Sequence, residues 1–113
     1  MTFDEYQKLA KRTDLGDATK GWNDPINFEK LLGLGGEAGE LMDKFKKVLR
    51  DKGGVVSEID RVKIVKEIGD VLWYLAVITD HLGVKFDEPA RVNIAKLASR
   101  AERNLIHGAG DNR

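Results

Sequence analysis

Apolar residues recur at helical spacing along nearly the whole chain, and its two prolines, Pro25 and Pro89, lie where helices are expected to begin. Thr2 and Ser57 each stand three residues before an acid, which predicts a capping box at two helix starts. Glycines at 53–54 and 83 predict two helix ends. The sequence therefore predicts an all-α fold, with helices over about residues 3–12, 25–52, 58–82 and 87–104.

The third predicted helix is apolar on every side from Val71 to Ile78. A helix of this kind must be covered all round, which three partner helices from a chain of 113 residues can hardly do alone. We therefore expect residues 1–113 to form a single domain, a four-helix bundle-like protomer whose core is completed by homo-oligomerisation. A homodimer and a homotetramer both fit, with Leu72, Leu75 and Ile78 buried at least partly between subunits.

Charge balance and the lack of cysteine exclude several classes of function. Lys+Arg and Asp+Glu both number 19, so there is no basic surplus to hold a nucleic-acid polymer. With no cysteine, the chain has no disulfide framework, thiolate zinc site or cysteine nucleophile, and it suits a reducing compartment. The apolar run VLWYLAVIT is too short to span a bilayer, and the N-terminus has no signal pattern. We expect a soluble, cytoplasmic protein without a membrane partner.

Carboxylates occupy helix positions that otherwise belong to the core. The segments EAGE and EIGD, 30 residues apart, repeat the pattern acid, any residue, glycine, acid. At about 100° per residue, Glu37 lies about 40° from the apolar Leu41. Glu67 repeats this position on the third predicted helix, and Glu40 and Asp70 flank the two. Carboxylates that converge between helices repel one another and resist desolvation, so they need protonation or a cation.

A hard divalent cation is the better partner for these four acids. The motifs offer only oxygen ligands, which favours Mg²⁺, with Mn²⁺ as an alternative, over zinc. A ferritin-like di-iron centre needs Glu-x-x-His pairs, whereas Glu67 is followed by Asp70. A single E-x-x-E pair is usually a solvated helix face, but two inward-facing pairs with the same glycine favour a site. We expect Gly39 and Gly69 to let the helices approach and to leave room for a ligand.

The segments GLGGEAGELMDKFKK and KEIGDVLWYLAVI resemble the MazG-like all-α nucleotide pyrophosphohydrolases, whose signature is E-x-x-E, a spacer and E-x-x-D. The resemblance covers about residues 22 to 100. It implies a hydrolase acting on phosphoric anhydride bonds, which uses Mg²⁺ to convert an NTP or dNTP to the monophosphate and pyrophosphate in nucleotide-pool house-cleaning or control. By this resemblance the metal ligands are Glu37, Glu40, Glu67 and Asp70.

Water is the expected attacking group, because the motifs contain no candidate covalent nucleophile. Either Glu37 or Glu40 is expected to act as the catalytic base, and the pattern does not choose between them. Many members of the resembled family carry two adjacent acids at the start of the first motif, where this chain has Gly36. The number of metal ions and the preferred base and sugar therefore stay open.

Substrate contacts are predicted with less specific signals. Lys44 lies two helical turns after Glu37 and is a candidate for phosphate binding. Asn93 and Lys96, in RVNIAKLASR, resemble an N-x-x-K-L segment that closes over the phosphates in small members of the family. Trp73 is more typical of a core or an interface, and the two histidines receive no role. Aromatic stacking and hydrogen bonding make three residues candidates for base recognition: Trp22, Asn23 and Tyr74.

A second function class fits the same sequence. In it the chain is a non-catalytic helical dimerisation or regulatory module that retains an acidic metal site. A test for Mg²⁺-dependent release of pyrophosphate separates the two classes, because only the enzyme would show this release.

Overall fold

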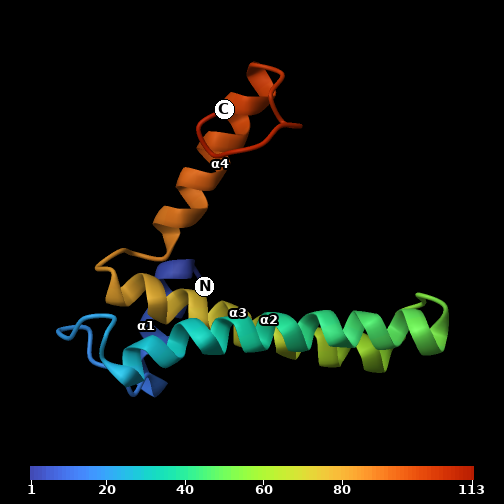
Figure 1. Cartoon of the computed structure of the whole chain (residues 1–113), viewed down its shortest axis with the longest axis horizontal. Coiled ribbons are helices and arrows are strands. Elements are labelled where there is room, and N and C mark those ends of the chain that lie inside the picture. Colours follow the sequence, from blue (N-terminus) through green and yellow to red (C-terminus); the bar gives the residue numbers. More distant parts are fainter.

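The computed structural model describes residues 1–113, all of whose regular elements are helices (Figure 1). The all-α prediction is confirmed, and the helix bounds lie close to the predicted ranges. None of the helices combines the length and apolar character needed to cross a membrane. In chain order the elements are α1 Phe3–Ala10, the 3-10 turn η1 Lys11–Thr13, α2 Pro25–Lys52, α3 Glu58–His81 and α4 Asp87–Glu102.

Local sequence signals fix where the helices begin and end. The Thr2 hydroxyl accepts from the Glu5 N–H at 3.1 Å, and the Glu5 carboxylate accepts from the Thr2 N–H at 2.9 Å. The same reciprocal pair forms between Ser57 and Asp60 at the start of α3. Gly53 ends α2 in the left-handed region, at φ 59°, where glycine carries no steric penalty. These caps leave a short turn that brings α3 back along α2.

The helices α2 and α3 form a long hairpin, and α1 packs against the C-terminal half of α3 (Figure 1). A small buried core joins α1 to α3 and to the segment before α4, with Ala10, Ala76, Val77 and Phe86 as its members. The buried Gln7 amide donates to the carbonyls of Ala76 and Val84. This end of the hairpin is therefore held by both apolar burial and buried hydrogen bonds.

The fourth helix differs from the expected bundle. It leaves the body at a steep angle and makes no extensive contact with α1, α2 or α3 (Figure 1). Its C-terminal half instead contacts the last residues of the chain, where the buried Arg100 donates to the carbonyls of Gly110 and Asp111. Within one chain, α1, α2 and α3 thus pack together and α4 stands apart.

Close approach of α2 and α3 occurs at a different glycine from those expected. A Cβ added at Gly33 would overlap the Tyr74 ring, whereas a Cβ at Gly39 or Gly69 would meet nothing within 4 Å. The expectation that Gly39 and Gly69 let the helices approach is therefore wrong within this chain. Gly35 also faces open space. The helices come together where an aromatic ring of α3 lies directly on the backbone of α2.

Replacing Gly33 by Ala should lower the free energy of unfolding by about 1–3 kcal/mol, because the methyl group forces the Tyr74 ring or the helices to move. Gly35→Ala is the matched control and should raise it by up to about 1 kcal/mol, since alanine is the better helix former at an open position. Urea unfolding of both variants beside the wild type measures the difference. Equal stability of the two variants would contradict the close contact.

Candidate metal centre between α2 and α3

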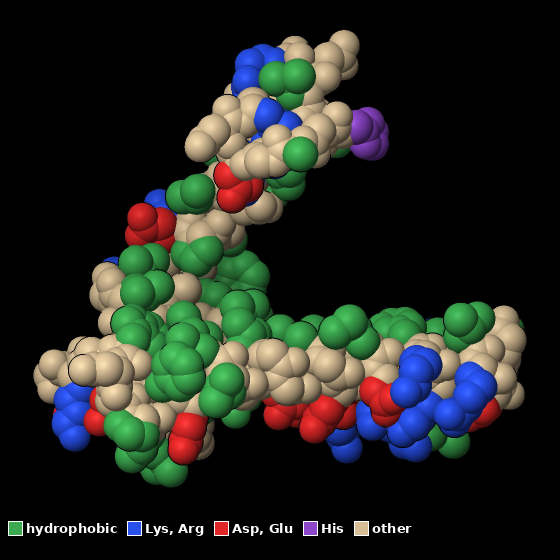
Figure 2. Space-filling model, viewed as in Figure 1, with side chains coloured by type: hydrophobic (Ala, Val, Ile, Leu, Met, Phe, Trp, Pro, Cys, Tyr) green, Lys and Arg blue, Asp and Glu red, His purple; other side chains and the backbone are tan.

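Three carboxylates meet at the middle of the hairpin. Glu37 of α2 and Glu67 and Asp70 of α3 each place an oxygen within 4.8 Å of the others. Glu37 and Glu67 are half-buried, while Asp70 is exposed. Acidic side chains gather along one edge of the hairpin, opposite an edge that is mostly apolar (Figure 2). We call these three residues the carboxylate group; their spacing allows one cation to contact all three.

One oxygen of the carboxylate group has no partner. Oε2 of Glu67 is buried and accepts no hydrogen bond, while its Oε1 lies 3.5 Å from Nζ of Lys44. A buried carboxylate oxygen without a donor is costly, and native structures rarely leave one unexplained. A hard divalent ion would supply the missing contact, so the donor set fits Mg²⁺ or Mn²⁺.

The electrostatics of Glu37 agree with a cation-binding role. Partial loss of water raises the pKa of Glu37, and the negative charges of Glu40, Asp70 and Glu67 raise it further. Glu40 itself is exposed and lies outside the carboxylate group, although it is close enough to influence Glu37. Without a bound cation, ionised Glu37 therefore opposes folding.

Two members of the carboxylate group, Glu37 and Glu67, belong to polar stripes that face each other along the hairpin. Residues seven apart complete nearly two helical turns and share a face. Where the stripes meet, Lys44 contacts Glu67 and Gly33 contacts Tyr74. We call the two stripes together the polar seam: Lys30, Glu37 and Lys44 on α2, and Glu67, Tyr74 and His81 on α3.

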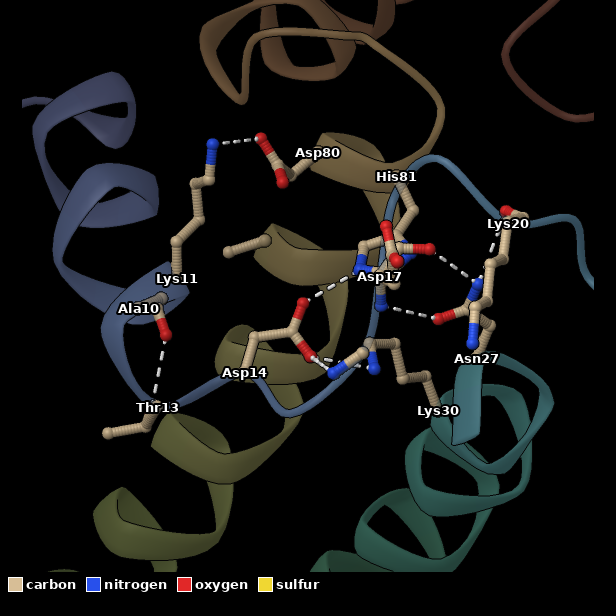
Figure 3. A network of polar contacts seen from close by, with 12 residues as sticks. Ala10, Lys11, Thr13, Asp14, Asp17, Lys20, Asn27, Lys30, Asp80 and His81 are labelled. Atoms are coloured by element: carbon tan, nitrogen blue, oxygen red, sulfur yellow. Dashed lines mark hydrogen bonds and ion pairs between the residues drawn. The ribbon is translucent and has the colours of Figure 1, made fainter. Parts of the chain in front are cut away.

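A buried polar network closes one end of the polar seam (Figure 3). Asp14, from the loop before α2, lies 2.7 Å from both Nζ of Lys30 and Nε2 of His81. The three side chains are only 7%, 6% and 4% exposed. Burial alone would raise the pKa of Asp14, but its contacts with Lys30, the Gly16 N–H and His81 outweigh burial and lower the pKa. The network ties the loop to both helices.

Sequence reasoning missed this network because Asp14 is a loop residue that reaches two helices. His81 received no role, yet its ring is buried against Asp14 and lies 5.8 Å from the ring of Trp22. The available signal was the seven-residue spacing of Lys30 from Glu37 and of His81 from Tyr74, which places each pair on one face of its helix. Asn27 anchors the same loop, since its amide donates to the carbonyls of residues 17, 20 and 21.

The structure brings some of the predicted substrate contacts to the seam. Lys44 lies beside the carboxylate group, and Tyr74 lies two turns from Glu67 on α3. Trp73 donates from Nε1 to Thr13 at 2.9 Å and packs against the core, which agrees with its expected place. Trp22 is half-buried in the anchored loop, and its neighbour Asn23 is exposed.

The two predicted residues of α4 lie elsewhere. Asn93 is exposed on α4, and Nζ of Lys96 pairs with Asp111 of the C-terminal segment at 3.0 Å. Because α4 stands apart from the hairpin, a single chain does not bring either residue to the carboxylate group (Figure 1).

Comparison with known proteins adds a family relationship. The sequence model of the MazG nucleotide pyrophosphohydrolase domain matches residues 29–104, which include all four motif acids. Over 117 aligned positions the chain is 46% identical to "Gene 37 protein" of Mycobacterium phage L5, and the alignment covers 100% of both chains. No solved structure matches significantly.

Removing the charge of Glu37 should leave the metal-free protein equally stable or slightly more stable near neutral pH. Folding raises the pKa of this acid above its ordinary value of 4.5, so ionised Glu37 opposes folding. Below that ordinary value it is protonated in both states, and the difference between wild type and Glu37→Gln should vanish.

Thermal unfolding in EDTA, from about pH 4 to pH 8, measures this difference. Glu29→Gln, at an exposed position of the same helix, is the control and should behave like the wild type. A Glu37→Gln variant that melts well below wild type at neutral pH would show that Glu37 is a stabilising structural acid.

Proposed function

Since this chain belongs to the MazG nucleotide pyrophosphohydrolase family, we propose that it is a Mg²⁺-dependent nucleoside triphosphate pyrophosphohydrolase. Its reaction converts an NTP or dNTP to the monophosphate and pyrophosphate, in house-cleaning or control of the nucleotide pool. The observation that carries this proposal is the carboxylate group with its unpartnered Glu67 oxygen, a donor set suited to a hard cation. Mn²⁺ is expected to substitute for Mg²⁺.

The chain's own residues divide the chemistry among them. Glu37, Glu67 and Asp70 would hold the ion, with Glu40 at the margin of the site. The bound ion would neutralise phosphate charge and lower the pKa of a coordinated water. Glu37 or Glu40 then accepts the proton of the attacking water. Lys44, already 3.5 Å from Glu67, is positioned to exchange that contact for a phosphate oxygen.

Recognition of the base is proposed at the loop end of the polar seam. A cavity of about 200 Å³ there is lined by Trp73, Tyr74 and the apolar Ile26, among others. Aromatic faces of this kind suit stacking on a nucleobase. The anchored loop carries Trp22 and Asn23 close to this end, because Trp22 packs on His81.

A homo-oligomer is proposed as the working form, because a single chain leaves too much surface open. Its accessible surface is 8172 Å², whereas a compact monomer of 12.6 kDa exposes about 6200 Å². Its radius of gyration of 17.0 Å likewise exceeds the roughly 13 Å of a compact domain of this length. The excess of about 2000 Å² per chain equals what each partner buries in a large obligate dimer.

Apolar side chains on the hairpin supply the surface that a second copy would cover. Several large residues of α2 and α3 are exposed, among them Phe45 at 48% and Leu75 at 39%. The apolar edge of the hairpin faces the open angle between the hairpin and α4 (Figure 2). Burying such a face is the dominant favourable contribution to association. The same evidence fits a dimer and a dimer of dimers.

The wild-type protein should release pyrophosphate from at least one of the eight common NTPs and dNTPs, and only with Mg²⁺ or Mn²⁺. Glu37→Gln should remain folded yet lose turnover by orders of magnitude, because it removes charge that stabilises the ion and the transition state. Glu88→Gln, at an exposed position on α4 that lines neither cavity, should keep normal turnover. Lack of pyrophosphate release from every substrate, with no Mg²⁺-dependent rise in melting temperature, would favour the non-catalytic module instead.

Light scattering at micromolar concentration should give the mass of a dimer or tetramer for the wild type. Leu75→Asp places a charge on the exposed apolar face of α3 and should give a dissociated or unfolded chain. Lys85→Asp, at an exposed loop position, is the control and should keep the wild-type mass. A monomeric wild type would contradict the proposed assembly.

A further inference from the structure

The free end of the hairpin contains a second cavity, and half of its eight lining residues are lysines. Its volume is about 240 Å³, and Lys44, Lys47, Lys52 and Lys63 line it together with Asp51 and Asp60. Four cations against two carboxylates leave the cavity positive. In Figure 2 the basic side chains gather beside the acidic ones, toward the free end of the hairpin. The chain as a whole is electrically neutral, so this is a local concentration of positive charge.

The cavity adjoins the carboxylate group through a shared residue. Lys44 lines the cavity, and its Nζ lies 3.5 Å from Oε1 of Glu67. Ile64, one turn before Glu67 on α3, is another lining residue. Lys44 therefore contacts both the carboxylate group and the cavity.

Existing ion pairs leave part of the positive charge available. Lys52 is committed to Asp60 at 2.7 Å, and this contact with that of Ser57 lowers the pKa of Asp60 to about 2. Lys47 contacts Asp43, which lies outside the cavity wall. Lys63 makes no ion pair. An anion could therefore contact Lys63 and Lys47 without first displacing a carboxylate of the cavity.

The two ends of the polar seam are chemically different. The cavity at the free end of the hairpin is lined by lysines, and the cavity at the loop end is lined by the rings of Trp73 and Tyr74. A nucleoside triphosphate has the same asymmetry, with a polyanionic tail and an aromatic base. The lysine-lined cavity is also below the roughly 300–1000 Å³ of sites that enclose a drug-sized ligand, so it suits one part of the substrate.

We propose that this cavity binds the β- and γ-phosphates, which leave as pyrophosphate when water is added across the α–β anhydride. The triphosphate then runs along the polar seam toward Gly53, and the nucleoside faces the loop that contains Trp22. This inference rests on the proposed function, because it assigns a direction to the substrate of the same site.

Calorimetric titration with inorganic pyrophosphate in the presence of Mg²⁺ tests the cavity directly. Lys63→Ala and Lys47→Ala should each weaken pyrophosphate binding about 10-fold, the loss typical of one charge-assisted contact. Lys46→Ala is the matched control for Lys47, since both lysines contact Asp43 but only Lys47 lines the cavity. Lys66→Ala, at an exposed position on α3, is the control for Lys63. Both controls should stay within about 2-fold of wild type, because neither lysine lines the cavity.

Kinetics separate this inference from the proposed function. The two cavity variants should raise KM for the triphosphate and weaken product inhibition by pyrophosphate, and Lys63→Arg should restore both. An active enzyme whose cavity and control variants behave alike would overturn the direction of the substrate and leave the function intact. Pyrophosphate binding that depends on Lys63 and Lys47, without hydrolysis of any triphosphate, would overturn the function and leave the cavity as an anion site. Circular dichroism of each variant checks that the chain remains folded.

Discussion

Repulsion among carboxylates between two packed helices is the constraint around which this molecule is arranged. Glu37, Glu67 and Asp70 share a small volume at the middle of the hairpin, and one oxygen of Glu67 is buried without a donor. Helix packing alone offers no relief, because moving either helix away would expose the apolar contacts beside the site. A bound cation would offset this repulsion. Lys44 offsets only part of it, because its ammonium group contacts Glu67 alone among the three carboxylates. The middle of the hairpin is therefore suited to binding more than to stability.

Stability has to come from either side of that strained middle. At the loop end, the Asp14 network and the Gly33 contact with Tyr74 fix the distance between α2 and α3. At the other end, the Ser57 cap and the Lys52 contact with Asp60 hold the turn. Two fixed ends keep the carboxylates at a set spacing, which is what preorganised ion binding requires.

Sequence reasoning succeeded where the physics is local. Capping boxes at Thr2 and Ser57 involve residues three apart, so the helix starts were readable from the chain alone. The carboxylates of α2 and α3 were also readable, because a fixed helical angle places them on one face. Prediction from the sequence failed where a contact depends on how two helices pack against each other. Which glycine meets α3 depends on the rotation of both helices, and the contact between Asp14 and His81 joins residues 67 positions apart.

The position of α4 connects chemistry to assembly. Asn93 and Lys96 resemble a family segment that closes over phosphates, yet α4 stands apart from its own hairpin. To reach a substrate at the carboxylate group, α4 must either fold over its own hairpin or meet the hairpin of a second copy. In both cases exposed apolar residues of α4, such as Ile94 at 67%, would have to be buried. In the proposed oligomer, where α4 would meet the hairpin of a second copy, closing the site over the phosphates and covering the apolar surface would be the same physical event.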